Sequence, residues 1–171
     1  MKGYVQVYTG DGKGKTTAAF GLALRAVGAG LRVFIAQFVK GRASSEHKAF
    51  ERFSDKVTIK QFGRRGFIKG KPSEEDIKAA REGLEAARSA LSSGDYDVVI
   101  LDEANVATHF GLISVDELMA VMDSRPAGVE LVITGRRADK RTIDGADLVT
   151  EMVDVKHYYQ QDVDAREGIE Y

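Results

Sequence analysis

A glycine-rich segment near the N-terminus constrains this chain more than any other feature. Residues 8–17 read Tyr-Thr-Gly-Asp-Gly-Lys-Gly-Lys-Thr-Thr, between a short apolar run at residues 4–8 and a helix-like run at residues 18–24. A strand, a glycine-rich turn and a helix form the context of a phosphate-binding loop, because backbone N–H groups and the positive end of the helix dipole then surround an anion. We predict such a loop here; the alternative is a glycine-rich turn with a solvated lysine.

Two side chains of this loop carry specific expectations. Lys15 can reach the terminal phosphates of a nucleotide, and the hydroxyl of Thr16 can bind Mg2+. The segment departs from the pattern G-x-x-x-x-G-K-[ST], because Thr9 stands where the first glycine belongs. Gly10 and Gly12 supply flexibility nearby, so the prediction of a phosphate-binding loop stands.

Composition limits the class of protein. A chain of 171 residues, 43% hydrophobic and 30% charged, is expected to form one soluble domain over residues 1–171. A net charge of −1 argues against binding of duplex nucleic acid. The absence of cysteine excludes disulfides, cysteine nucleophiles and thiolate zinc sites, and it fits the cytoplasm. Neither a signal peptide nor a membrane span is expected.

Apolar runs alternate with helical patterns along the chain. This alternation predicts an α/β fold with a mostly parallel sheet, helices on both of its faces and a C-terminal extension from about residue 154. Gly28 and Gly30 are expected to cap the first helix, and Ser73 with Asp76 is expected to form a capping box. The expected strands are residues 4–8, 31–39, 57–62, 97–102, 129–135 and 147–153. The expected helices are residues 15–27, 45–53, 73–94, 114–125 and 139–144.

The apolar run at residues 98–101 ends in two carboxylates, Asp102 and Glu103. A buried strand that ends in paired acids requires a cationic partner, and Mg2+ held opposite Thr16 would be one. His47, His109 and His157 are widely separated and are not expected to bind a metal. No serine has an obvious base beside it. These observations together predict a Mg2+-nucleotide site.

Cations follow three other predicted strands. Lys40 and Arg42 come at the carboxyl end of one strand, and Arg136 and Arg137 follow another. Ligands of open α/β sheets bind at the carboxyl ends of strands, so these cations could face a polyanion. For Lys40, a solvated basic loop is an equal alternative. Residues 63–72 carry four cations, three glycines and a Phe-Ile pair, and they are either a binding element or a plain surface loop.

Several segments, in order along nearly the whole chain, resemble the ATP:corrinoid adenosyltransferases of the cobalamin pathway. Residues 9–17, Thr-Gly-Asp-Gly-Lys-Gly-Lys-Thr-Thr, and residues 147–152, Asp-Leu-Val-Thr-Glu-Met, are the distinctive ones. On this resemblance Thr9 is a family variant of the loop. The other similar segments are residues 18–21, 25–28, 37–41, 99–105, 132–136 and 155–157.

The resemblance implies a P-loop NTPase-like fold, a homodimer and a defined reaction. The reaction joins the 5′-carbon of ATP to the cobalt of a reduced corrinoid, such as cob(I)alamin or cob(I)yrinic acid a,c-diamide, and releases tripolyphosphate. Co(I) is itself the nucleophile, so the protein needs none. The resemblance also implies that ATP lies in the reversed sense in the loop. A flavoprotein that reduces Co(II) is a candidate partner.

Site residues follow from the resemblance position by position. Lys15, Thr16 and Glu103 are expected to be catalytic, and Thr16, Asp102 and Glu103 are expected to form the Mg2+ site. Arg136 is expected to contact ATP, and Phe67 is expected to cover the corrinoid. Lys40 is also expected to contact ATP, from its place at the carboxyl end of a strand. The residues expected to hold the triphosphate are Gly10, Asp11, Gly12, Lys13, Gly14, Lys15, Thr16 and Thr17.

The chain also departs from the family pattern. Lys69 stands where members have a tryptophan beside the corrinoid, and Asp162 stands where a glycine is expected. Lys69 keeps open a nucleotide-gated corrinoid carrier as an alternative to adenosyl transfer. A γ-phosphoryl-transferring kinase or ATPase is a further alternative.

Overall fold

The computed structural model describes residues 2–41, 44–63 and 70–170. The expectations for Arg42, Phe67 and Lys69 lie outside the described residues.

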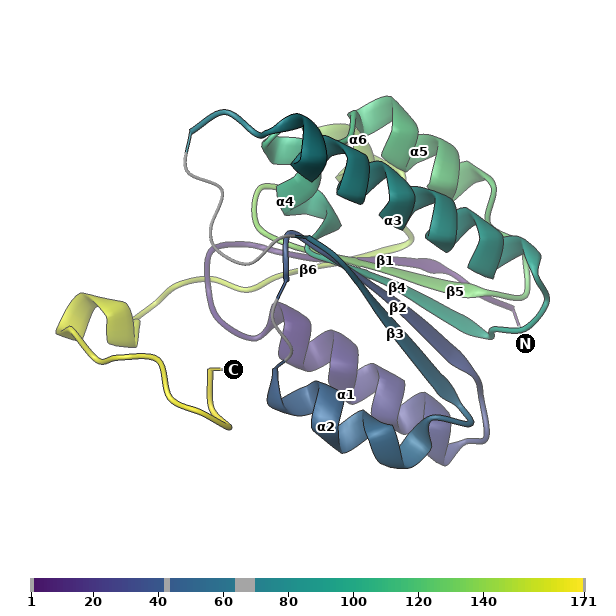
Figure 1. The fold of residues 1–171 in the computed structure, drawn as a ribbon, viewed down its shortest axis with the longest axis horizontal. Helices are drawn as coiled ribbons and strands as arrows, with labels where there is room; N and C mark the ends of the chain where they lie inside the picture. Colours follow the sequence, from purple (N-terminus) through teal and green to yellow (C-terminus); the bar gives the residue numbers. More distant parts are fainter. Residues whose placement is uncertain (1, 42–43, 64–69, 171) are drawn as a thin grey trace.

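Six parallel strands form one sheet with the order β3-β2-β4-β5-β1-β6. Helices cover both faces, with α1 and α2 on one face and α3 to α6 on the other (Figure 1). The predicted α/β fold with a P-loop NTPase-like arrangement is confirmed. The strands are β1 (Val5–Thr9), β2 (Val33–Phe38), β3 (Val57–Phe62), β4 (Val98–Asp102), β5 (Glu130–Thr134) and β6 (Leu148–Glu151).

The helices follow the strands along the chain. Two short 3-10 segments, Glu51–Phe53 and Tyr158–Gln161, accompany them. The helices are α1 (Lys15–Gly28), α2 (Ser45–Phe50), α3 (Glu74–Ser92), α4 (Ala104–His109), α5 (Val115–Asp123) and α6 (Lys140–Asp144). No helix among the described residues has the length and apolar character that a membrane crossing requires.

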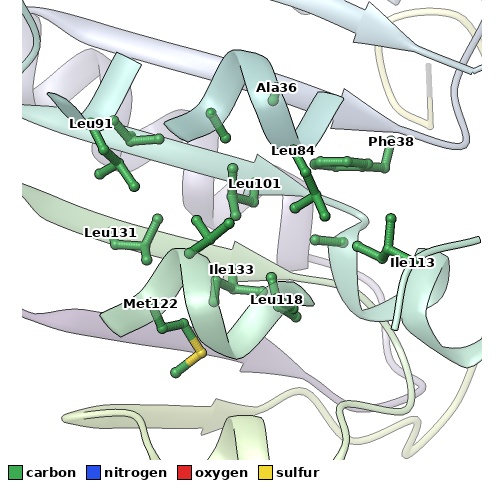
Figure 2. Packing of buried hydrophobic residues seen from close by; sticks show 14 of the residues in the cluster. Ala36, Phe38, Leu84, Leu91, Leu101, Ile113, Leu118, Met122, Leu131 and Ile133 are labelled. Atoms are coloured by element: carbon green, nitrogen blue, oxygen red, sulfur yellow. The ribbon is translucent and has the colours of Figure 1, made fainter. Parts of the chain in front are cut away.

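Two hydrophobic cores lie on the two faces of the sheet. Successive side chains of a strand point to opposite faces, so β4 sends Val99 and Leu101 into one core and Val98 and Ile100 into the other. In the first core, Leu101 packs among residues of the strands, α3 and α5 (Figure 2). Burial on both faces explains why the central strands read as continuous apolar runs.

Local signals predicted most helix starts. The capping box of Ser73 and Asp76 is present, and Ser114 caps α5 in the same way. Gly30 has a left-handed φ of 82° just past α1, as expected of a capping glycine. The expectation for Gly28 is wrong, because Gly28 is the last residue of α1 and Ala29 is the cap.

The short helix α4 was not expected. It begins directly after β4, so no turn sequence separates the two elements, and Glu103 makes the connection in a left-handed conformation with φ 62°. Asp162 is also left-handed, with φ 52°. The conformation explains why a glycine would suit position 162, and Asp is among the residues that tolerate it.

All strands run in one direction, so their carboxyl ends meet at one edge of the sheet. The loops after β1, β2, β4 and β5 therefore gather there. The C-terminal segment beyond β6 lies at the same end of the molecule (Figure 1).

Candidate active site at the carboxyl edge of the sheet

The predicted phosphate-binding loop runs from Gly10 to Gly14 and leads into α1. Gly10 and Gly14 have left-handed φ values of 93° and 122°. A Cβ atom at Gly12 would lie 2.7 Å from the carbonyl oxygen of Val153, and one at Gly10 would lie 2.4 Å from that of Met152. The Gly12 N–H donates to the Met152 carbonyl at 2.7 Å. The loop therefore needs glycine because the segment after β6 packs directly against it.

Lys15 is buried, with 7% of its surface exposed. Its Nζ donates to the Gly12 carbonyl oxygen at 2.5 Å, so the ammonium group folds back over the loop. Burial and, next, the positive charge of Arg136 lower the pKa of Lys15. Glu103 and Asp11 oppose this shift, and a bound phosphate group would offset the buried positive charge further.

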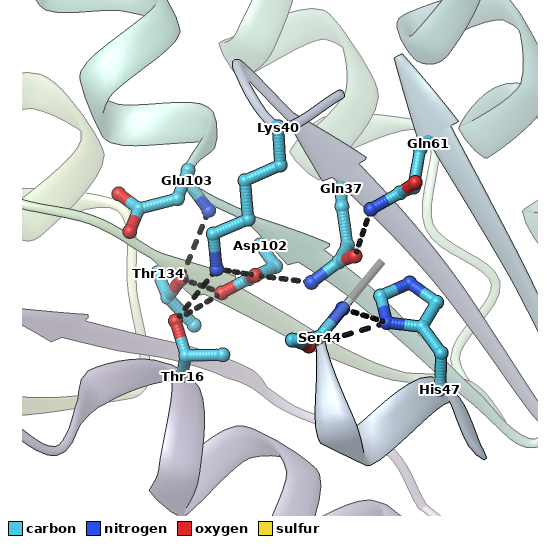
Figure 3. Close-up of polar contacts among 9 residues, drawn as sticks. All are labelled: Thr16, Gln37, Lys40, Ser44, His47, Gln61, Asp102, Glu103 and Thr134. Atoms are coloured by element: carbon cyan, nitrogen blue, oxygen red, sulfur yellow. Dashed lines mark hydrogen bonds and ion pairs between the residues drawn. The ribbon is translucent and has the colours of Figure 1, made fainter. Parts of the chain in front are cut away.

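Asp102 lies at the centre of the polar network (Figure 3). It is fully buried, and its Oδ1 accepts hydrogen bonds from Thr16 at 2.9 Å and Thr134 at 2.7 Å. Its Oδ2 accepts from Gln37 at 2.9 Å and Lys40 at 2.8 Å. Burial alone would raise the pKa of Asp102, but the charge and hydrogen bond of Lys40, with the other donors, hold it below its usual value. Asp102 is thus an ionised anchor that four donors surround.

Lys40 turns back into the site after β2. Val39 has a φ of 61°, which is unusual for a β-branched residue and redirects the chain at this point. The Lys40 Nζ then lies 2.8 Å from Asp102 Oδ2 and 3.3 Å from Thr16 Oγ1. Burial lowers the pKa of Lys40, but Asp102 outweighs this effect and raises it. Lys40 is therefore an ion-paired site residue, and its description as a solvated loop cation is wrong.

Glu103 presents a carboxylate to the same region. Its backbone N–H donates to Thr134 Oγ1 at 3.0 Å, and its carboxylate points away from Asp102 (Figure 3). Burial and the charge of Asp102 raise the pKa of Glu103. Within the described part of the chain, this carboxylate accepts no side-chain hydrogen bond or ion pair, which leaves both oxygens available to a cation.

Of the remaining predicted site residues, Arg136 lies with the polar cluster, whereas Lys13, Asp11 and Thr17 make no side-chain hydrogen bond or ion pair with it among the described residues. Arg136 follows β5 and acts electrostatically on both Lys15 and Glu103, so it belongs to the cluster. Lys13 points elsewhere: its Nζ donates at 2.9 Å to Ile169 O and at 2.9 Å to Glu170 Oε1 of the C-terminal segment. Asp11, in the loop, and Thr17, in the first turn of α1, are exposed.

Two polar residues of the network were not singled out from the sequence. Gln37 is 1% exposed and Thr134 is fully buried, and both donate to Asp102. A glutamine inside the apolar run 31–39 and a threonine at the end of 129–135 were the available signals, because a buried polar side chain needs a partner.

Thr16 and Glu103 offer the kind of oxygen donors that Mg2+ binds. Mg2+ takes oxygen ligands and usually only one or two carboxylates, with substrate phosphates and water completing the shell. Thr16 Oγ1 and the Glu103 carboxylate fit this description. The described residues hold no group of three or more acidic, histidine or cysteine side chains that would bind a metal without a phosphate ligand.

The sheet order, the loop between β1 and α1, and the acidic end of β4 define a P-loop type α/β protein. A family model described as "ATP:corrinoid adenosyltransferase BtuR/CobO/CobP" matches residues 1–171. This chain belongs to that family of adenosyltransferase enzymes.

Curated relatives agree with this assignment. A corrinoid adenosyltransferase of Pseudomonas aeruginosa is 37% identical over 171 residues, which cover 99% of this chain and 84% of that protein. One from Escherichia coli is 34% identical, with 99% and 86% covered. The corrinoid adenosyltransferase CobA of Salmonella typhimurium is 33% identical, with the same coverage.

Proposed function

We propose that this enzyme transfers the 5′-deoxyadenosyl group of ATP to the cobalt of a reduced corrinoid and releases tripolyphosphate. In this reaction the electron pair of Co(I) forms the bond to the 5′-carbon. The bond from that carbon to the phosphate oxygen breaks, and its electron pair leaves with tripolyphosphate. The observation that carries the proposal is the buried Lys15 at the predicted phosphate-binding loop, with the exposed Arg136 acting on it electrostatically, in a chain of this family.

The protein's contribution to this step is electrostatic. The leaving tripolyphosphate gains negative charge as the carbon–oxygen bond breaks, and fixed donors in a buried site stabilise such charge strongly. Lys15 and Arg136 would supply two positive charges. The backbone N–H groups of residues 10–17 and the start of α1 would hold the triphosphate, with ATP in the reversed sense so that its 5′-carbon faces the corrinoid.

Thr16 and Glu103 would hold Mg2+, and the ion would neutralise part of the triphosphate charge. The four hydrogen bonds on Asp102 support an indirect role for this residue: it fixes the Thr16 hydroxyl through the 2.9 Å contact. Lys40 donates to both Thr16 and Asp102, and it would move toward a phosphate oxygen when the nucleotide binds.

The corrinoid is proposed to bind beside residues 63–72, with Phe67 over its face. Cob(I)alamin and cob(I)yrinic acid a,c-diamide are the proposed substrates. Lys69 in place of tryptophan favours a second candidate function, a nucleotide-gated corrinoid carrier that binds both ligands without transfer.

We further propose a single cytoplasmic domain that acts as a homodimer and receives Co(I) from a flavoprotein reductase. The exposed edge strand β6, with Leu148 45% and Val149 41% exposed, supports an association surface. Light scattering coupled to gel filtration measures the mass, and a monomer at micromolar concentration would contradict the homodimer.

Substitution of Lys15 provides the test of the phosphate assignment. With ATP, Mg2+ and chemically reduced cobinamide, wild-type enzyme should form a cobalt–carbon bond that is visible in the absorption spectrum. Lys15→Ala should lower the rate at least about 100-fold, because it removes a buried positive charge that would stabilise the leaving tripolyphosphate. Lys78→Ala, on the surface of α3, is the matched control and should keep wild-type activity. Near-normal activity of Lys15→Ala would contradict the assignment.

A further inference from the structure

Thr9 joins two loops of the active site. It is the last residue of β1 and is 7% exposed. Its carbonyl oxygen accepts from the Met152 N–H at 2.9 Å, which ties it to the segment after β6. Its side-chain Oγ1 accepts from the Ala138 N–H at 3.3 Å, in the loop after β5. A glycine at this position would keep the first contact and lose the second.

The loop after β5 needs such a contact to hold its shape. Gly135 has a φ of 128°, and Arg137 has a left-handed φ of 57°, which is uncommon for a residue other than glycine. Asn105 Nδ2 donates to the Gly135 carbonyl at 3.3 Å at the start of the loop. The Thr9 hydroxyl binds Ala138 at its end. Arg136 therefore lies between two side-chain anchors, and Thr9 supplies the second.

We propose that Thr9 is a positioning residue whose hydroxyl holds the loop of residues 135–138, so that Arg136 faces the triphosphate. This inference rests on the proposed function for the identity of the bound anion. It assigns a physical reason to the threonine that stands where a phosphate-binding loop normally has glycine. The side chain adds a hydrogen-bond acceptor that couples the β1 loop to the β5 loop.

The test measures the affinity for tripolyphosphate in the presence of Mg2+ by calorimetry. Steady-state kinetics of the same variants give kcat and the KM for ATP. Thr9→Val keeps the shape and removes the acceptor, so we expect a loss of affinity of about 2- to 10-fold, no larger than that of Arg136→Ala. The loss should appear in KM for ATP as well. Thr9→Ser keeps the hydroxyl and should restore affinity to within about 2-fold of wild type.

A double-mutant cycle separates positioning from general damage to the loop. In an Arg136→Ala background, Thr9→Val should cause no further loss, because the residue that it positions is gone. Thr142→Val is the matched control: Thr142 is fully buried in α6, and its Oγ1 has no hydrogen-bond partner among the described residues. This control should leave tripolyphosphate affinity unchanged.

Wild-type affinity in Thr9→Val, or an equal loss in both backgrounds, would overturn the proposal. If Thr9→Val fails to fold, Thr9→Gly carries the same test, since glycine is the usual residue of such loops. The proposed function is judged separately. Coupling between Thr9 and Arg136 without adenosyl transfer would overturn the function and leave the positioning role intact, whereas no binding of tripolyphosphate to wild type would overturn both.

Discussion

At the scale of the residue, Asp102 is the anchor of the polar network. It is the only fully buried carboxylate among the residues that the structure describes, and each of its oxygens accepts two hydrogen bonds. An ionised carboxylate in such a place is stable only because Lys40 and three neutral donors compensate the loss of water. The hydrogen bond from Thr16 also orients the Thr16 hydroxyl, so Asp102 contributes both to stability and to the proposed metal site.

Asp102→Asn tests this dependence. An amide of the same shape places an NH2 group against existing donors and leaves Lys40 unpaired, so the free energy of unfolding should fall by about 2 to 4 kcal/mol at pH 7. Urea denaturation measures the difference. Asp95→Asn, at an exposed side chain, is the control and should change stability by less than about 0.5 kcal/mol.

The pH dependence of this difference has a definite sign. Because the pKa of Asp102 is lowered in the folded protein, its stabilisation is fully present above the ordinary value of 3.8 and is lost as the pH falls through the lowered folded pKa. The gap between wild type and Asp102→Asn should therefore shrink below about pH 4. A gap that is absent at pH 7 would contradict the account of Asp102 as an ionised anchor.

At the scale of the element, the phosphate-binding loop depends on a segment 140 residues away in the chain. Met152 and Val153, after β6, pack against Gly10 and Gly12. The Met152 backbone donates a hydrogen bond to the Thr9 carbonyl and accepts one from the Gly12 N–H. This contact gives the family-like segment at residues 147–152 a physical role, which is to support the loop from outside the sheet. No local pattern predicts it, because it arises only when β6 pairs with β1.

Gly12→Ala tests this packing. A Cβ atom at position 12 would lie 2.7 to 2.8 Å from carbonyl atoms of Met152 and Val153, so the loop or the segment has to move. We expect nucleotide affinity to fall at least about 10-fold, with a loss of about 1 to 3 kcal/mol in stability. Gly21→Ala is the control, since a Cβ atom there meets open space. Wild-type affinity in Gly12→Ala would show that the close approach has no effect on binding.

The elements themselves were largely predictable from the sequence. Apolar runs and capping residues predicted β3 at Val57–Phe62 and the starts of α3 and α5. The place of Lys40 at the carboxyl edge was expected, but its ion pair with Asp102 was not predictable, because the pair depends on the backbone reversal at Val39. Gln37 and Thr134 were missed for a related reason, since a polar residue in a buried strand reveals its partner only in three dimensions.

At the scale of the whole molecule, the sheet order brings the site together. The neighbours of β1 are β5 and β6, and β4 lies between β2 and β5, so Lys15, Lys40, Asp102 and Arg136 meet although they are far apart in sequence. Alternation along the chain predicts a parallel sheet but does not give this order. The resemblance of several segments to one enzyme family predicted that these distant residues form one site, and a family model that matches residues 1–171 agrees with the family.

In the proposed reaction, the triphosphate of ATP leaves as one unit. Phosphorus NMR of a reaction with ATP, Mg2+ and Co(I) corrinoid identifies the products directly. We expect tripolyphosphate to form in an amount equal to that of the cobalt–carbon bond. Formation of ADP and phosphate would contradict it in favour of γ-phosphoryl transfer, and tight binding of both ligands with no product would contradict it in favour of a carrier.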